Sequence, residues 1–304
     1  MDVSTSKIEH IVLSGGNIYG FTFYGILKTL HQKGVWNLSN IKTIYATSVG
    51  SIISTIVALN YDWETIDRYL INRPLGELIN FDLATMFGCI KNCGFFTIKL
   101  IEEYFYNLFT GKDMSPRITM DEFYKNTGIE LHFFTTKVDG FEIVDLSYKT
   151  HPNWTMVEAI YASSAIFPFL SPMFKENQLY IDGGFLLNNP LNKCLLKCQE
   201  NFQNDFRADS ILLICLKQRP SPTKYLTTDN IFTFFEEFIE NILKKMSIEN
   251  ENMNADENKI KYRFEIDSTY MNGMDFTIYT KKESRKELIE YGVKLTNESP
   301  ILVL

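Results

Sequence analysis

The stretch Ile41-Lys42-Thr43-Ile44-Tyr45-Ala46-Thr47-Ser48-Val49-Gly50-Ser51-Ile52-Ile53 decides the fold of this 304-residue chain. Its first half is rich in β-branched and aromatic residues, which predicts a buried strand. After Gly50 the apolar residues recur with a near-helical period, which predicts a helix. The small residues around Ser48 fit the small-x-Ser-x-Gly nucleophile elbow, in which a strand turns sharply into a helix. Ser48 is therefore a candidate nucleophile, with the N–H of Val49 directed at the reacting oxygen; the alternative is a serine in an ordinary tight turn.

A glycine turn lies upstream, after the apolar run of residues 8–13. The segment Ser14-Gly15-Gly16-Asn17-Ile18-Tyr19-Gly20 follows this predicted strand and leads into a predicted helix over residues 20–33. Backbone N–H groups at a helix N-terminus bind anions, so this loop is a candidate oxyanion hole. It has neither the spacing of a dinucleotide site nor the Gly-Lys-Ser/Thr of a P-loop. The resulting strand–helix–strand–helix opening predicts a parallel sheet with helices on its faces.

The rest of the chain continues this alternation. Strands are predicted over residues 131–136, 141–145, 179–181 and 210–216, and helices over residues 63–72, 95–109, 155–164, 190–201, 231–246 and 282–296. The aromatic-rich helix over residues 95–109 fits either core or lid packing, or a cap over an apolar ligand site. Residues 81–92 are an apolar segment whose sequence does not decide between a helix and another structure. Residues 247–259 are predicted to form a polar loop or a disordered insertion. With no internal repeat and no linker in the sequence, we expect one α/β domain, with its core over residues 8–200 and elements over residues 201–304 that complete it.

Composition limits the classes of partner. The net charge of −7 argues against general nucleic-acid binding, which needs a basic face, but not against a zwitterionic lipid surface. The first ten residues have no apolar signal region, and no apolar stretch approaches the roughly 18 residues of a spanning helix. We therefore expect a soluble cytoplasmic protein that works at membrane surfaces.

The five cysteines, an odd number, fit a reducing compartment. Cys89 and Cys93, like Cys194 and Cys198, are four residues apart and could share a helix face. Zinc sites usually have tighter spacing with turn residues around the ligands. These cysteines are therefore predicted to be small core residues, and no metal site is expected.

A serine nucleophile needs a base, and the order of residues restricts the choice. In the α/β-hydrolase order a histidine follows the acid, but every histidine of this chain precedes Asp182. The histidines are His10, His31, His132 and His151. A carboxylate can accept the proton itself if it lies within hydrogen-bond reach of the serine. Asp182 is the best candidate, because it ends a predicted strand and the two glycines after it allow a close approach and a sharp turn; the alternative is an ordinary turn.

Together these features resemble the patatin-like phospholipase family over roughly residues 8–198. That family has a glycine-rich oxyanion loop, a small-x-Ser-x-Gly elbow and an Asp-Gly-Gly/Ala motif, in the order found here. Residues 162–172, Ala-Ser-Ser-Ala-Ile-Phe-Pro-Phe-Leu-Ser-Pro, are similar to its Ala-Ser-x-Ala-x-x-Pro segment. Residues 182–190, Asp-Gly-Gly-Phe-Leu-Leu-Asn-Asn-Pro, are similar to its Asp-Gly-Gly…Asn-x-Pro block. Three positions depart from the family pattern: Ala46 replaces a glycine, Asn17 replaces the third glycine of the loop, and Tyr19 stands where a basic residue is common.

The resemblance implies a three-layer patatin-like α/β fold, with a mostly parallel central sheet and helices on both faces. It also implies a lipid acyl hydrolase in which Ser48 attacks a fatty-acyl ester, Asp182 accepts its proton, and an acyl-enzyme forms without a metal or other cofactor. The implied oxyanion hole comprises Gly15, Gly16, Asn17 and Val49, and the implied motif positions are Gly20, Ala46, Gly50, Gly183 and Gly184.

The resemblance leaves two functional classes open. The first is the hydrolase, whose expected partners are a lipid or membrane-surface substrate and an unidentified protein activator. The second is a catalytically weak or silent patatin-fold protein that binds lipid or a protein partner, because Ala46, Asn17 and Tyr19 depart from the family pattern around the site. Covalent labelling by a serine-directed reagent distinguishes the two.

Overall fold

The computed structural model describes residues 8–80, 82–202, 208–217, 260–271 and 276–300, together with residues 234, 238, 241 and 242. The polar loop predicted over residues 247–259, and most of the helix predicted over residues 231–246, lie outside the described residues. The strands are β1 (His10–Leu13), β2 (Thr43–Thr47), β3 (Glu130–Lys137), β4 (Glu142–Leu146), β5 (Met173–Lys175), β6 (Gln178–Asp182), β7 (Ile211–Lys217) and β8 (Tyr262–Asp267). The α-helices are α1 (Gly20–Gln32), α2 (Val49–Ala58), α3 (Trp63–Asp67), α4 (Leu75–Leu78), α5 (Leu83–Asn92), α6 (Lys99–Thr110), α7 (Met120–Thr127), α8 (Met156–Ser164), α9 (Leu191–Phe202) and α11 (Lys282–Asn297).

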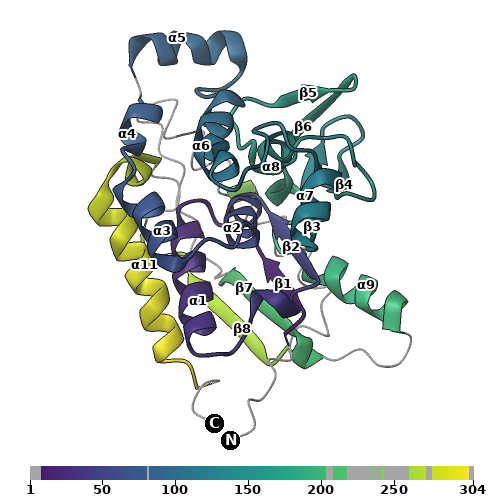
Figure 1. Cartoon of the computed structure of the whole chain (residues 1–304). Coiled ribbons are helices and arrows are strands. Elements are labelled where there is room, and N and C mark those ends of the chain that lie inside the picture. Colours follow the sequence, from purple (N-terminus) through teal and green to yellow (C-terminus); the bar gives the residue numbers. More distant parts are fainter. Residues whose placement is uncertain are drawn as a thin grey trace, which may run out of the picture.

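The described strands form one mixed sheet in the order β5-β6-β3-β2-β1-β7-β8, with β4 also paired to β3 (Figure 1). The run from β3 through β2, β1 and β7 to β8 is parallel. The pairs β3/β4, β3/β6 and β5/β6 are antiparallel. The predicted α/β class is therefore confirmed, with an antiparallel extension at one side of the parallel part.

Alternating side chains along the strands divide the interior into two cores. On β2, Ile44 and Ala46 belong to the larger core, which also includes residues of α1, α2, α6, α8 and α11. Tyr45, between them, belongs to the smaller core against α9. This period of two is what a sheet covered on both faces requires. Helices on both faces are thus confirmed.

The strand register brings the three predicted motifs together at one end of the central strands. Leu13, the last residue of β1, pairs with Ala46 of β2, so the loop after β1 and the elbow after β2 leave the sheet side by side. Thr47 pairs with Phe134 of β3. One residue further along β3, Thr135 pairs with Asp182, the last residue of β6. The carboxyl ends of β1 and β2 and the end of β6 therefore meet at the same place.

The helix predicted over residues 95–109 is shorter than expected. It begins at Lys99, because Phe95 and Phe96 bond instead to the segment before β5. The N–H of Phe95 donates to the carbonyl of Pro168 over 2.9 Å, and Phe96 forms a bridge with Leu170. A tertiary contact thus takes the place of the first helical turn.

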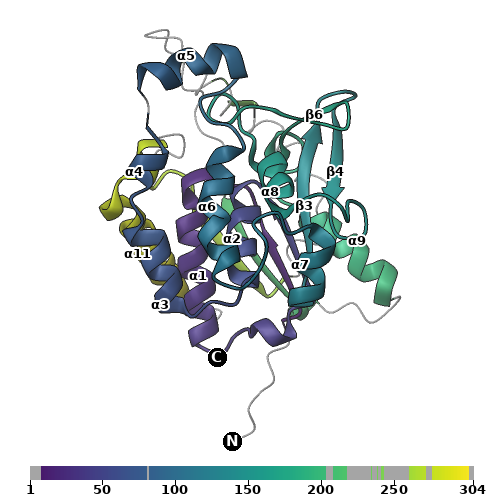
Figure 2. The same ribbon diagram turned by 45° about the horizontal axis from the view of Figure 1, so that its top comes forward.

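The cysteine prediction is half right. Cys194 and Cys198 are buried in the smaller core, as expected. Cys89 is only partly covered and Cys93 is exposed, so the prediction that they are core residues is wrong. The reason is the position of α5, which extends away from the body of the protein in both views (Figures 1 and 2).

The C-terminal elements join the same sheet and the same core. β7 pairs with β1, and β8 pairs with β7. Helix α11 packs along α1 (Figure 1), and two glycines allow the two helices to approach closely. A Cβ on Gly25 would lie 2.3 Å from the carbonyl oxygen of Ile289, and one on Gly292 would lie 2.3 Å from that of Thr22. In the described part of the chain, each helix is too short or too polar to cross a membrane.

Candidate active site

Ser48 occupies a strained turn between β2 and α2. Its φ of 55° and ψ of −126° lie in a region that side-chain-bearing residues rarely adopt. The turn is held by a hydrogen bond of 3.0 Å from the Ser48 N–H to Ser163 Oγ. It also packs closely on β1, since a Cβ on Gly50 would lie 2.7 Å from the carbonyl oxygen of Leu13. Ala46 is fully buried in β2, so the elbow forms with alanine at this position.

Ser48 and Asp182 are in direct contact. Ser48 Oγ donates to Asp182 Oδ2 over 2.5 Å, and the N–H of Gly184 donates to Asp182 Oδ1 over 2.6 Å. Asp182 is 3% exposed. Burial raises the pKa of Asp182 to about 6, although the hydrogen bonds from Ser48 and Gly184 oppose the rise. A carboxylate that titrates near neutral pH and accepts a bond from a serine hydroxyl can act as a general base.

The residues after Asp182 fix the direction of its side chain. The N–H of Asp182 donates to the carbonyl of Ala165 over 3.1 Å. Gly183 lies so close to β3 that a Cβ would come within 2.1 Å of the Phe134 carbonyl oxygen. A Cβ on Gly184 would lie 2.9 Å from Asp182 Oδ1. Both glycines are therefore required for space, which is the physical basis of the Asp-Gly-Gly pattern.

The glycine loop after β1 lies directly beside the elbow. A Cβ on Gly15 would lie 3.3 Å from Ser48 Cβ. The N–H of Gly15 donates to the carbonyl of Asn188 over 2.9 Å, so it does not point to a substrate in this arrangement. This hydrogen bond argues against Gly15 as an oxyanion donor, and the N–H groups of Gly16 and Val49 become the main candidates. Gly20 makes room for Val49, because a Cβ on Gly20 would lie 2.3 Å from Val49 Cγ2.

Asn17 and Tyr19, two of the departures from the family pattern, bind a C-terminal segment that sequence reasoning did not connect with the site. Asn17 has a φ of 47°, in the left-handed region that asparagine tolerates. Its Oδ1 accepts a hydrogen bond of 3.1 Å from the hydroxyl of Tyr279. Tyr19 is buried, and its hydroxyl donates to the carbonyl of Met271 over 2.7 Å. No local motif could have revealed Tyr279, since its contact spans 262 residues of sequence.

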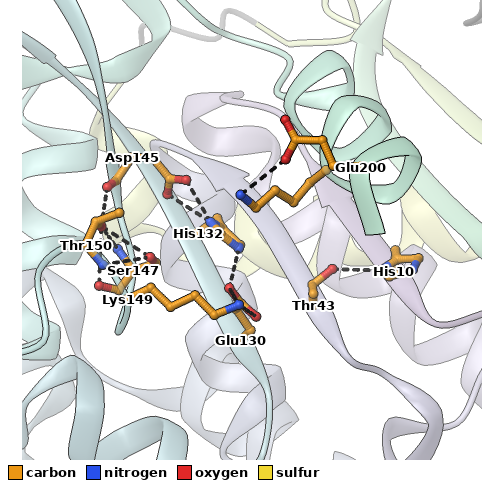
Figure 3. A network of polar contacts seen from close by, with 10 residues as sticks. His10, Thr43, Glu130, His132, Asp145, Ser147, Lys149, Thr150 and Glu200 are labelled. Atoms are coloured by element: carbon orange, nitrogen blue, oxygen red, sulfur yellow. Dashed lines mark hydrogen bonds and ion pairs between the residues drawn. The ribbon is translucent and has the colours of Figure 1, made fainter. Parts of the chain in front are cut away.

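The described contacts of the histidines lie away from Ser48 and Asp182. His132 Nδ1 is 2.8 Å from Asp145, and its Nε2 is 3.1 Å from Glu130 (Figure 3). Ring nitrogens of the other histidines lie within hydrogen-bond distance of Thr43 for His10, of Trp63 for His31 and of Thr150 for His151. Among the described residues, no three His, Cys, Asp or Glu side chains gather so that they could hold a metal ion.

Comparison with known proteins identifies the fold family. Residues 11–195, more than half of the chain, match the family model of the patatin-like phospholipases. The chain belongs to this family. The matched residues include the glycine loop, Ser48 and Asp182 of this patatin-like chain, whereas Tyr279 lies outside them.

Two viral proteins are similar to this patatin-like chain. One, "Uncharacterized protein R571" of Acanthamoeba polyphaga mimivirus, is 29% identical over 190 residues, or 62% of each chain. The match thus spans less than two thirds of that relative. The other, "Probable lipid hydrolase 463L" of Invertebrate iridescent virus 6, is 26% identical over 67% of this chain and 68% of its own.

Among solved structures, VipD from Legionella pneumophila has the same fold. It aligns with a TM-score of 0.52 and 13% identity, over 98% of this chain and 67% of VipD. At this identity the likeness concerns the fold alone. The patatin-like fold inferred from the motifs is thereby confirmed.

Proposed function

We propose that this protein is a lipid acyl hydrolase that cleaves fatty-acyl esters through a Ser48–Asp182 dyad and an acyl-enzyme. The observation that carries the proposal is the 2.5 Å hydrogen bond from Ser48 Oγ to a buried carboxylate, on a serine held at a strained strand–helix elbow. Membership of the patatin-like phospholipase family supports a lipid substrate. The viral relative named as a probable lipid hydrolase supports the same substrate class.

In the first half of the reaction, Ser48 Oγ attacks the ester carbonyl carbon while its proton passes to Asp182 Oδ2. The negative charge moves to the carbonyl oxygen, where the N–H groups of Gly16 and Val49 stabilise it. The N–H of Asn17, also predicted from the sequence to belong to the oxyanion hole, is the third donor to this oxygen. The tetrahedral intermediate then collapses. The C–O bond to the alcohol breaks, and Asp182 gives its proton to the departing oxygen.

In the second half, a water molecule takes the place of the alcohol. Asp182 accepts a proton from this water as its oxygen attacks the acyl carbon of the Ser48 ester. The second tetrahedral intermediate collapses, Ser48 Oγ leaves and recovers the proton from Asp182, and the fatty acid departs. One carboxylate thus serves as base and acid in turn, which suits a pKa near neutrality.

Fluorophosphonate labelling combined with ester hydrolysis tests this proposal. Wild-type protein should be labelled, and Ser48→Ala should lose both the label and about 10⁴-fold or more of the hydrolysis rate. Ser54→Ala is the matched control, because Ser54 lies on the same helix and only donates to the carbonyl of Ser51. Unchanged hydrolysis by folded Ser48→Ala protein would contradict the proposal, and absence of label in the wild type would favour the silent lipid- or protein-binding alternative.

A further inference from the structure

Helix α5 presents an exposed apolar face. Ile90 is 84% exposed and Phe87 is 72% exposed, the two highest values among the large apolar side chains that the structure describes. The two residues are three positions apart and therefore lie on the same side of the helix. Contiguous apolar exposure of this kind marks an interaction surface more often than a scattered single residue does.

The other described side chains of α5 do not pack into the protein either. None of its described side chains is buried, and none belongs to a hydrophobic core. The helix is anchored mainly at its C-terminal side, where Gly94 approaches Ser171 so closely that a Cβ would lie 2.4 Å from the Ser171 nitrogen. Ten-residue helices are marginal in water without tertiary packing. An apolar environment around Phe87 and Ile90 would therefore stabilise α5 as well as bury these side chains.

The anchor of α5 connects it to the candidate active site. The N–H of Phe95 bonds to the carbonyl of Pro168, in the segment that also carries Phe169. The ring of Phe169 stacks on that of Tyr279 with 6.3 Å between centroids, and Tyr279 bonds to Asn17 of the glycine loop. The exposed helix and the catalytic loop thus share one chain of contacts.

A second pair of exposed apolar side chains lies on strands β5 and β6. Phe174 of β5 pairs with Leu179 of β6, and they are 70% and 36% exposed. β5 and β6 occupy the same end of the molecule as α5 in Figure 1, and Figure 2 shows β6 at that end as well. This is also the end toward which β1 and β2 direct the glycine loop and Ser48.

Two lysines near this end are neutralised by ion pairs with carboxylates. Lys175 pairs with Glu158 over 2.5 Å, and Lys137 pairs with Glu142 over 2.5 Å. The net charge of −7 opposes binding to anionic lipid. We propose that Phe87 and Ile90, together with Phe174 and Leu179 at the same end of the molecule, form an interfacial surface that inserts into zwitterionic lipid and presents the Ser48 site to it. The choice of lipid as the occupant rests on the proposed function.

Flotation with phosphatidylcholine vesicles measures binding by this surface. All proteins in the experiment carry Ser48→Ala, so that ester hydrolysis does not interfere. The double variant Phe87→Glu/Ile90→Glu should bind about tenfold or more weakly than this parent, because each apolar side chain no longer leaves water. Leu196→Glu is the matched control, since Leu196 is a 55% exposed leucine on α9. It should bind as the parent does. Phe87→Trp should show a blue-shifted emission on vesicle addition, and phosphatidylserine should not strengthen binding.

Each contrary outcome is distinct. Equal binding by the double variant and the parent, or no binding by the parent, overturns the proposal. Self-association of the parent that the double variant abolishes, without vesicle binding, assigns the face to a second copy of the chain instead. A protein that cleaves dissolved esters but ignores vesicles keeps the proposed function and loses this surface. A protein that binds vesicles through α5 but does not hydrolyse esters keeps this surface and loses the proposed function.

Discussion

The carboxyl group of Asp182 determines how the proposed reaction should depend on pH. Burial raises its pKa to about 6, and only the ionised form can accept the Ser48 proton. The value of kcat/KM should therefore rise with pH and level off above about 6. Asp182→Asn should abolish turnover, whereas His151→Gln should keep it within about tenfold, because His151 bonds to Thr150 rather than to the dyad. A dead His151→Gln variant beside an active Asp182→Asn variant would refute the dyad.

The same pKa links Asp182 to stability. Because its folded-state pKa lies above the ordinary value of 3.8, Asp182 contributes stability below pH 3.8 that is lost as the pH rises through about 6. Replacing it with asparagine removes this dependence. The melting temperature of Asp182→Asn relative to wild type should therefore be higher at pH 8 than at pH 5, which thermal denaturation at both pH values can measure.

Asn17 allows the backbone and the side chain of the glycine loop to be tested separately. Asn17→Gly and Asn17→Ala both remove the acceptor of the Tyr279 hydroxyl, but only alanine is strained at a φ of 47°. The strain costs about 1–2 kcal/mol. Asn17→Ala should therefore be up to about tenfold slower in ester hydrolysis than Asn17→Gly, which should match or exceed wild type. A large loss in Asn17→Gly would mean that the side chain itself supports the reaction.

At the scale of elements, the contact between α2 and β1 should make Gly50 irreplaceable. A Cβ at this position would lie 2.7 Å from the Leu13 carbonyl oxygen and 2.8 Å from that of Ser14, and backbone atoms cannot move aside easily. Gly50→Ala should lower the free energy of unfolding by about 1–3 kcal/mol. Gly76→Ala in α4 is the control, because its nearest neighbour would be Thr280 Cβ at 3.6 Å. Urea denaturation of both variants measures the difference, and equal stability would contradict the packing argument.

Elements with strong local signals could be predicted from the sequence. The predicted strands over residues 131–136 and 210–216 agree with β3 and β7 to within a residue or two, because their apolar runs are long and bounded by turns. Helix α7 was missed, although Thr119 and Glu122 form a capping box at its start. That signal was available, since Ser/Thr followed three residues later by Glu marks a helix N-terminus. Strand β5 has only three residues, which is too short for a period to be visible.

The candidate site was predictable only where its residues belong to local motifs. Ser48 and Asp182 each lie in a turn whose small residues are visible in the sequence, so their contact could be expected. Tyr279 and the bond between Gly15 and Asn188 depend on distant parts of the chain meeting. Such contacts have no local pattern, and only the folded structure reveals them.

At the scale of the whole molecule, Arg285 ties the C-terminal helix to the N-terminal half. It is 2% exposed, and its guanidinium donates to the carbonyls of Ile71, Arg73 and Tyr279. Arg285→Met would leave three carbonyls without this donor, so it should lower the free energy of unfolding by about 3 kcal/mol or more. The neighbouring exposed Lys286→Met is the control and should change it little. Chemical denaturation measures both, and equal stability of the two variants would rule out this role.

The His132 cluster makes the stability of the molecule depend on pH. Burial alone would lower the pKa of His132, but the hydrogen bond to Asp145 and the close carboxylate of Glu130 raise it. The ring stacks on Tyr45 with 4.4 Å between centroids, in the core beneath α9. Its charge therefore contributes stability below pH 6.5 that is lost as the pH rises through the raised value. The melting temperature of wild type minus that of His132→Gln should shrink as the pH rises above 6.5. Asp182, by contrast, becomes an active base as the pH rises, because only its ionised form accepts the Ser48 proton. Raising the pH should therefore increase the reactivity of the site while it removes the stabilisation that the charge of His132 contributes to the fold.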